Sequence, residues 1–214
     1  MANEIQLWDF RNSKLVASKI LSREKFAEPS EISHDRDPQF IRYADDGSKL
    51  ILCQKGHLFV LDSDTLNQLQ AIDLGKSAWP PVPPRWGAGD SYVADIEPDA
   101  NATRAALLMK WGTGGGELRV YDIISGNLVR KWNFPNFDFG GISIDPGGSR
   151  VAISLLPFSP GERPLPSRVR NVFIYDVNSG EIASKFNTGY LAAEIRFVGS
   201  DTVATVSAEV GLGG

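Results

Sequence analysis

A short pattern that ends in aspartate occurs four times in the chain and constrains the fold more than any other feature. An aliphatic residue stands four and two positions before each Asp, and a bulky residue stands immediately before it. The copies are IQLWD (5–9), LFVLD (58–62), LRVYD (118–122) and VFIYD (172–176). Alternation with a period of two places the aliphatic residues on one buried face of a β-strand. A turn and a further apolar segment follow, so each copy predicts an antiparallel strand pair.

A second pattern, an apolar strand, a turn and another apolar strand, precedes three of these copies and occurs once more near the C-terminus. Its copies are FIRYADDGSKLILCQ (40–54), VADIEPDANATRAALLMKW (93–111), ISIDPGGSRVAISLL (142–156) and EIRFVGSDTVATVS (194–207). The turns contain Gly, Asn and Asp, which supply the positive φ that tight hairpins need. The two patterns together form units of four antiparallel strands, named A to D in chain order. A repeated four-stranded unit of roughly 40 to 50 residues is typical of a β-propeller blade.

The phase of the repeat predicts a single all-β domain over residues 1–214, with 16 strands and half a blade at each terminus. The expected parts are a half blade (3–21), three blades (38–74, 92–133 and 140–187) and a second half blade (190–207). Unpaired sheet edges favour association, so the half blades should find partners. The chain could close on itself as four blades, pair with a second copy as eight, or be completed by blades outside it.

Two features of the repeat resemble the WD40 and WD40-like propeller family over residues 3–207. One is the turn of the DDGSKL and DPGGSR type between strands A and B, and the other is the strand that ends in Trp-Asp, Tyr-Asp or Leu-Asp. Only Trp8-Asp9 is a literal Trp-Asp pair. The Gly-His dipeptide expected before strand A is absent, since Gly56-His57 precedes a strand C. The resemblance implies a β-propeller of four-stranded blades.

The long connections of such a propeller gather on one face, because D–A connections and B–C loops lie at the same ends of the strands. This set holds nearly every long segment of the chain, whereas the A–B and C–D turns are short. The long segments are 21–37, 76–90, 111–117, 133–141, 157–168 and the tail 208–214. Binding residues concentrate on loops that a rigid scaffold holds, so this face is the predicted binding face.

Two aromatic segments on this face are candidate partner-binding sites. The first, AWPPVPPRW, places Trp79 and Trp86 around four prolines, with Arg85 beside Trp86. The prolines favour extended polyproline geometry, which presents the side chains at little entropic cost. The second, NFPNFDF, contains Phe137 and Phe139. Aromatic and Arg side chains are typical of interface hot spots, but large aromatics also fold down to cap neighbouring blades.

A basic segment of the same face, PFSPGERPLPSR, contains Arg163 and Arg168. These arginines are candidates for contact with an acidic partner, or they form a solvated basic loop.

The sequence offers little catalytic or cofactor-binding chemistry. Its two histidines, His34 and His57, have no metal-ligand neighbours at a suitable spacing, and Cys53 is its only cysteine. The glycines of GTGGGE (112–117) lack the Lys-Ser/Thr of a phosphate-binding loop, and an alternating strand follows them where such a loop needs a helix. We therefore predict no catalytic residue, no metal and no cofactor, and a chain that is not an enzyme.

The formal net charge of −4 argues against a general nucleic-acid or acidic-membrane partner. No apolar run reaches the length of a membrane span, and MANEIQLWDF lacks the order of a secretory leader, which predicts a cytoplasmic chain. The predicted function is a scaffold that binds a protein or peptide on its long-loop face, with a second copy or another chain as a possible ring-completing partner. The alternative is an enzyme or small-ligand site at the mouth of the central channel, completed by a second chain or by missing blades.

Overall fold

The computed structural model describes residues 3–9, 13–21, 40–54, 56–74, 92–111, 115–157, 171–188 and 192–207. Within these ranges the chain forms 16 strands and no helix, so no helix there is long and apolar enough to cross a membrane. The strands are β1 (Asn3–Asp9), β2 (Lys14–Leu21), β3 (Phe40–Tyr43), β4 (Lys49–Gln54), β5 (His57–Asp62), β6 (Gln68–Asp73), β7 (Tyr92–Pro98), β8 (Arg104–Lys110), β9 (Gly116–Asp122), β10 (Leu128–Phe134), β11 (Phe137–Ile144), β12 (Arg150–Pro157), β13 (Asn171–Asp176), β14 (Ile182–Asn187), β15 (Ala192–Phe197) and β16 (Val203–Ser207).

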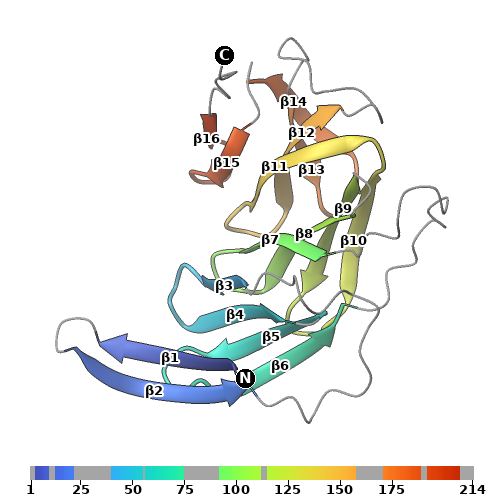
Figure 1. Cartoon of the computed structure of the whole chain (residues 1–214). Coiled ribbons are helices and arrows are strands. Elements are labelled where there is room, and N and C mark those ends of the chain that lie inside the picture. Colours follow the sequence, from blue (N-terminus) through green and yellow to red (C-terminus); the bar gives the residue numbers. More distant parts are fainter. Residues whose placement is uncertain are drawn as a thin grey trace, which may run out of the picture.

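The strands form three four-stranded sheets and two hairpins. Each sheet is an antiparallel meander in chain order, β3 to β6, β7 to β10 and β11 to β14, while β1–β2 and β15–β16 form two-stranded sheets. The sheets fan out one after another along an open arc, with β3, β7, β11 and β15 on its inner side (Figure 1). This is an all-β arrangement of antiparallel propeller blades, in which A is the innermost strand.

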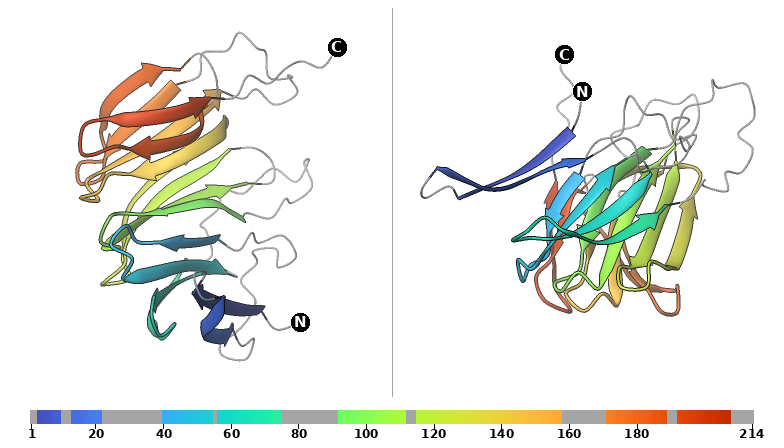
Figure 2. Two further views of the ribbon diagram at one scale, coloured as in Figure 1. Left: turned by 90° about the vertical axis from the view of Figure 1, so that its left-hand side faces the viewer. Right: turned by 90° about the horizontal axis from the view of Figure 1, so that it is seen from below.

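The two hairpins lie at opposite ends of the arc (Figures 1 and 2). Because β1–β2 and β15–β16 remain separate two-stranded sheets, the described residues do not close on themselves as a four-bladed ring. The described half blades therefore present open edges.

The hydrophobic core lies between consecutive sheets. Leu58, Val60, Leu118 and Val120, which are aliphatic residues of the Asp-terminated pattern, are fully buried there. Full burial of such a side chain stabilises the fold by about 1.5 to 3 kcal/mol. Alternation along each strand thus builds the interface between neighbouring blades.

The aspartate that ends the pattern caps the C–D turn. The Asp122 carboxylate accepts hydrogen bonds from the Ser125 backbone N–H at 2.7 Å and from its hydroxyl at 2.9 Å, and Asp62 and Asp176 accept equivalent bonds from Thr65 and Ser179. These bonds hold the pKa of each aspartate below its ordinary value of 3.8. The carboxylate at this position accepts the donors of the turn, which accounts for the Asp at the end of the pattern.

The connection predicted as a long loop over 133–141 is instead a tight turn. β10 extends to Phe134 and β11 begins at Phe137, so only residues 135–136 join the two strands. Phe134 packs edge-on against both Phe137 and Phe139, and this aromatic contact holds the ends of the two strands together.

Candidate binding site on the inner wall

The inner strands carry polar side chains at one equivalent position. In each of β3, β7, β11 and β15 the residue before the last one of the strand is polar: Arg42, Glu97, Ser143 and Arg196. Because inner strands of consecutive sheets lie side by side, these residues form a row along the concave wall. The row has a basic residue at each end, with an acidic residue and a neutral serine between them.

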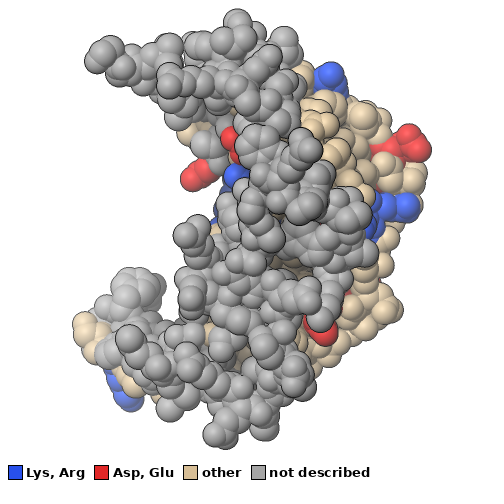
Figure 3. Space-filling model, turned by 45° about the vertical axis from the view of Figure 1, so that its right-hand side comes forward, with Lys and Arg blue, Asp and Glu red and all other residues tan. Residues whose placement is uncertain are grey.

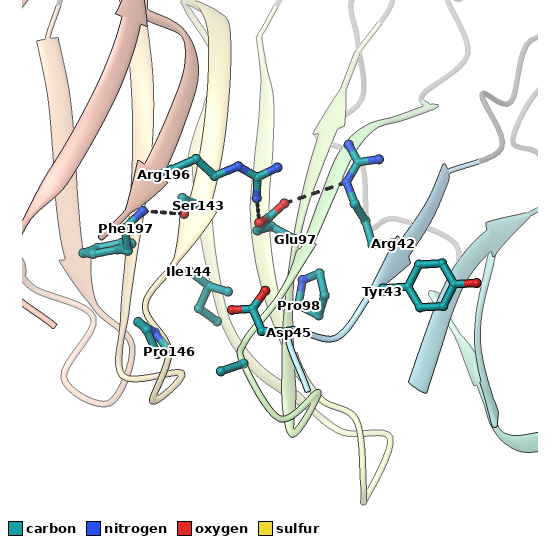
Figure 4. Close-up of a pocket in the computed structure, with 11 residues that line it drawn as sticks. Arg42, Tyr43, Asp45, Glu97, Pro98, Ser143, Ile144, Pro146, Arg196 and Phe197 are labelled. Carbon is teal, nitrogen blue, oxygen red and sulfur yellow. Dashed lines mark hydrogen bonds and ion pairs between the residues drawn. The ribbon is translucent and has the colours of Figure 1, made fainter. Parts of the chain in front are cut away.

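Glu97 is the centre of this row. Its side chain is 12 % exposed and lies between two guanidinium groups (Figure 4). Arg42 Nε lies 3.8 Å from Glu97 Oε2, Arg42 Nη2 donates to Asp95 Oδ1 at 3.0 Å, and Arg196 pairs with Glu97 from the other side. Two opposite charges offset the cost of removing the Glu97 carboxylate from water.

Arg196 reaches its partner across an intervening strand. It belongs to β15, whereas Glu97 belongs to β7, and β11 lies between them and contacts both. The β11 residue at this level is Ser143, whose hydroxyl accepts a hydrogen bond from the Phe197 backbone N–H at 3.1 Å. Its small side chain leaves room for the guanidinium to pass (Figure 4).

A cavity of about 340 Å³ opens beside this row. The row forms one side of it, and A–B turn residues, including Asp45, Ala100 and Pro146, form another. Figure 3 shows the hollow of the arc, where both acidic and basic side chains reach the surface. The lining can bind a polar ligand through charges of either sign. The part of the chain that the structure describes holds no group of three or more His, Cys, Asp or Glu able to bind a metal.

A second charged cluster is buried between the first two complete sheets. Arg119 pairs with Glu117, and its Nη1 donates to the Leu74 carbonyl at 2.6 Å and to the Tyr121 hydroxyl at 3.2 Å. Lys131 Nζ lies 3.6 Å from Glu117 Oε2. Burial raises the pKa of Tyr121, so its hydroxyl stays protonated at neutral pH. This cluster ties β9 to the end of β6.

The partner-binding candidates from the sequence fall into two groups. Phe139 is 5 % exposed and Phe137 is partly buried, and both belong to the core between β7–β10 and β11–β14. Lys110 Nζ lies 5.8 Å from the centre of the Phe139 ring. The other candidates, Trp79, Arg85, Trp86, Arg163 and Arg168, lie outside the described residues. The structure thus brings Phe137 and Phe139 together, at the junction of two blades.

Arg42, Glu97 and Arg196 were not predicted from the sequence. Their signal is positional, since each immediately precedes the last residue of an inner strand. Aligning the four A strands on their turns would have placed them in one row.

Comparisons with known proteins identify the fold. No protein-family model and no curated protein sequence matches the chain. The chain is similar to the solved structure of the Dos1 propeller, with a TM-score of 0.55 and 16 % identity over 90 % of this chain and 44 % of that one. It is also similar to KlHsv2 with loop 6CD replaced by a Gly-Ser linker, with a TM-score of 0.53 and 14 % identity over 78 % of this chain and 48 % of that one. A third similar structure is that of the RRP9 WD40 repeats, with a TM-score of 0.52 and 12 % identity over 78 % of this chain and 44 % of that one.

The chain thus spans less than half the length of the structures it matches. Together with the four-stranded antiparallel sheets, these similarities show a WD40-like β-propeller fold.

Proposed function

We propose that this chain is a non-enzymatic segment of a WD40-like propeller scaffold, which binds a protein or peptide on the face that carries its long D–A and B–C connections. The observation that carries this proposal is the difference in length between the connections of the two faces.

The turns of the opposite face are nearly uniform. Every A–B turn has five residues (44–48, 99–103, 145–149 and 198–202), as does every C–D turn of the complete sheets (63–67, 123–127 and 177–181). These turns gather on one face (Figure 2, right). The connections between strand ends of the other face run up to eighteen residues, as between β2 and β3 and between β6 and β7. Such length is typical of segments with a function of their own.

We further propose that Trp79, Arg85 and Trp86 form the main contact within this face, with Arg163 and Arg168 as its basic part. Tryptophan and arginine dominate the binding energy of protein interfaces, and the prolines around Trp79 and Trp86 lower the entropy lost on binding. Phe137 and Phe139 pack against Phe134 and support the base of the face.

The test compares W79A/W86A with a matched control on the opposite face. Ile124 lies in a C–D turn and is 72 % exposed, so I124A removes an apolar side chain of that face without touching the core. A partner is first isolated by crosslinking and affinity capture from the source organism, and its Kd is then measured by titration calorimetry against each purified variant.

We expect W79A/W86A to weaken binding at least about thirtyfold, as for a hot spot worth 2 kcal/mol or more, and I124A to leave Kd unchanged. Urea unfolding verifies that each variant is folded. A folded W79A/W86A protein that binds with the wild-type Kd contradicts the assignment of these tryptophans. Loss of binding in I124A alone contradicts the choice of face.

A further inference from the structure

One carboxylate of the inner-wall cavity has no counter-ion among the described residues. Asp45 lines the cavity from the A–B turn of the first complete sheet, and its carboxylate points from that turn toward the row of polar residues on the inner wall (Figure 4). Within the part of the chain that the structure describes, its side chain forms no hydrogen bond and no ion pair. Both of its oxygens are therefore free to accept bonds from a ligand.

The two arginines that line the cavity are already engaged. Arg42 Nη2 donates to Asp95 Oδ1 at 3.0 Å, and Arg196 pairs with Glu97. Each guanidinium thus has a carboxylate of its own, and Asp45 is a third carboxylate, which leaves this group of side chains with a net negative charge at neutral pH. An anion would have to compete with a bound carboxylate for either arginine. A cation meets a carboxylate that is free.

Contacts between neighbouring turns fix the position of Asp45. The N–H of the adjacent Asp46 donates to the Ala100 carbonyl at 3.3 Å, and Lys49 Nζ donates to the Asn101 carbonyl at 3.0 Å. These bonds hold the A–B turn of the first complete sheet against that of the second. A carboxylate on a turn that is already held in place loses little conformational freedom when a ligand binds to it.

The equivalent positions of the next two turns bring no further charge to the cavity. The residues that correspond to Asp45 are Ala100 and Pro146, which line the cavity as well. Asp45 is therefore the one charged side chain that the described A–B turns contribute to the lining. The volume of about 340 Å³ lies within the range of sites for small molecules. The cavity has room for one compact group beside this carboxylate.

We infer that the inner-wall cavity binds an alkylguanidinium ion, with Asp45 as its counter-ion. A planar guanidinium donates two parallel hydrogen bonds to a carboxylate whose two oxygens are both free. Glu97 attracts the same cation at longer range, and Arg196 weakens this attraction because it offsets the charge of Glu97. The A–B turns lie on the face opposite the long connections (Figure 2), so this site is separate from the proposed loop-face contact.

The experiment titrates the full chain with three probes and follows the backbone amide chemical shifts by NMR. N-acetyl-arginine amide carries the guanidinium, and N-acetyl-citrulline amide replaces it by a neutral ureido group of the same shape. Butylguanidine carries the cation without peptide bonds. We expect saturable shifts at residues 43–48 and 97–100 with both guanidinium probes and none with the citrulline probe. Tighter binding of the arginine probe than of butylguanidine identifies a peptide side chain as the source of the cation, and equal binding identifies the free cation.

Three variants test the role of each charge. D45N keeps the shape of Asp45 without its charge and should weaken binding of the arginine probe about fivefold to tenfold, between the effects of an exposed ion pair and of a charge-assisted hydrogen bond. D64N is the matched control, because Asp64 is exposed in a C–D turn of the same sheet and does not line the cavity. R196Q should instead tighten binding, since Glu97 keeps only Arg42, at 3.8 Å, to offset its charge.

The sign of each change decides the outcome. Binding that weakens in D45N, tightens in R196Q and stays unchanged in D64N supports the inference. Equal binding of the citrulline probe overturns it, as does a wild-type Kd in a D45N protein whose free spectrum shows it to be folded. Weaker binding in R196Q also overturns it, because that result identifies an anion site. W79A/W86A should bind the arginine probe with the wild-type Kd, so failure of the loop-face proposal leaves this inference standing.

Discussion

The buried pair of Glu117 and Arg119 gives the sharpest test of how the first two complete sheets are held together. The variants are E117L, R119M and E117L/R119M, which replace the charges singly and together by apolar side chains of similar size. The side chains are 2 % and 5 % exposed, so a charge that loses its partner gains little solvation in return.

The loss of stability in each variant depends on which charged or polar group it leaves buried without a partner. E117L leaves the Arg119 guanidinium buried without its carboxylate, a loss of about 3 to 5 kcal/mol in the free energy of unfolding. R119M should cost less, because Lys131 stays 3.6 Å from Glu117 and still offsets its charge. The double variant removes both charges and leaves chiefly the Leu74 carbonyl without the donor that Arg119 supplied, about 1 to 3 kcal/mol.

Urea unfolding, followed by tryptophan fluorescence at pH 7, measures these differences. With an m-value of about 3 kcal/mol per molar urea, E117L lowers the midpoint by roughly 1 to 1.7 M. All variants are compared at one protein concentration, so that any association affects their apparent stability equally. The double variant should be more stable than E117L. A double variant that loses the sum of the two single losses would refute the argument, since it would show that the two charges do not interact.

Three further predictions concern the inner wall, the turns and the glycine segment. E97Q, which keeps the shape of Glu97 but removes its charge, should lower the free energy of unfolding by about 1 to 2 kcal/mol at low salt and by less in 1 M NaCl, since Arg196 is 57 % exposed. The pKa of Asp122 is lower in the folded chain than its ordinary 3.8. The ionised Asp122 carboxylate therefore contributes its full stabilisation above pH 3.8, and this stabilisation is lost as the pH falls through the folded pKa. Urea midpoints measured from pH 6 down to pH 2 should consequently decline less steeply in D122N than in the wild type. G116A should unfold the chain or sharply lower its thermal midpoint, because a Cβ there would lie 2.1 Å from the Met109 carbonyl oxygen. In G47A the added Cβ meets no atom within 4 Å, so the only cost is the backbone strain of a non-glycine residue at a φ of +70°. Circular dichroism melts compare the two, and equal midpoints would contradict the packing argument.

The repeat was readable because its signals are local. Alternation with a period of two and an aspartate at the turn act within a few residues, so the four-stranded sheets follow from the sequence alone. The segment 133–141 was misread as a loop because Asn, Pro and Gly are typical loop residues. Contacts of Phe134 with Phe137 and Phe139 outweighed that local preference.

The charged clusters escaped prediction for a different reason. The alternation of β9 assigns Leu118 and Val120 to a buried face, which suggests that Glu117 and Arg119 face water. In a stack of sheets both faces are covered by neighbours, so the charges are buried too. Whether a charged residue on such a strand finds its counter-ion depends on the adjacent blade, and no window of sequence within one blade contains that information.

The contact of Arg196 with Glu97 over Ser143 has a consequence for the curvature of the molecule. It joins β15 to β7 and therefore spans two junctions between sheets. If the arc of sheets were flatter, Arg196 and Glu97 would lie further apart. If it were more sharply curved, the two side chains would press on Ser143 between them. The residue beneath this contact is Ser143, and we expect its small side chain to permit a sharper turn between successive blades than a larger one would. A bulkier residue at position 143 would make the turn between successive blades less sharp, so more blades would be needed to close one ring.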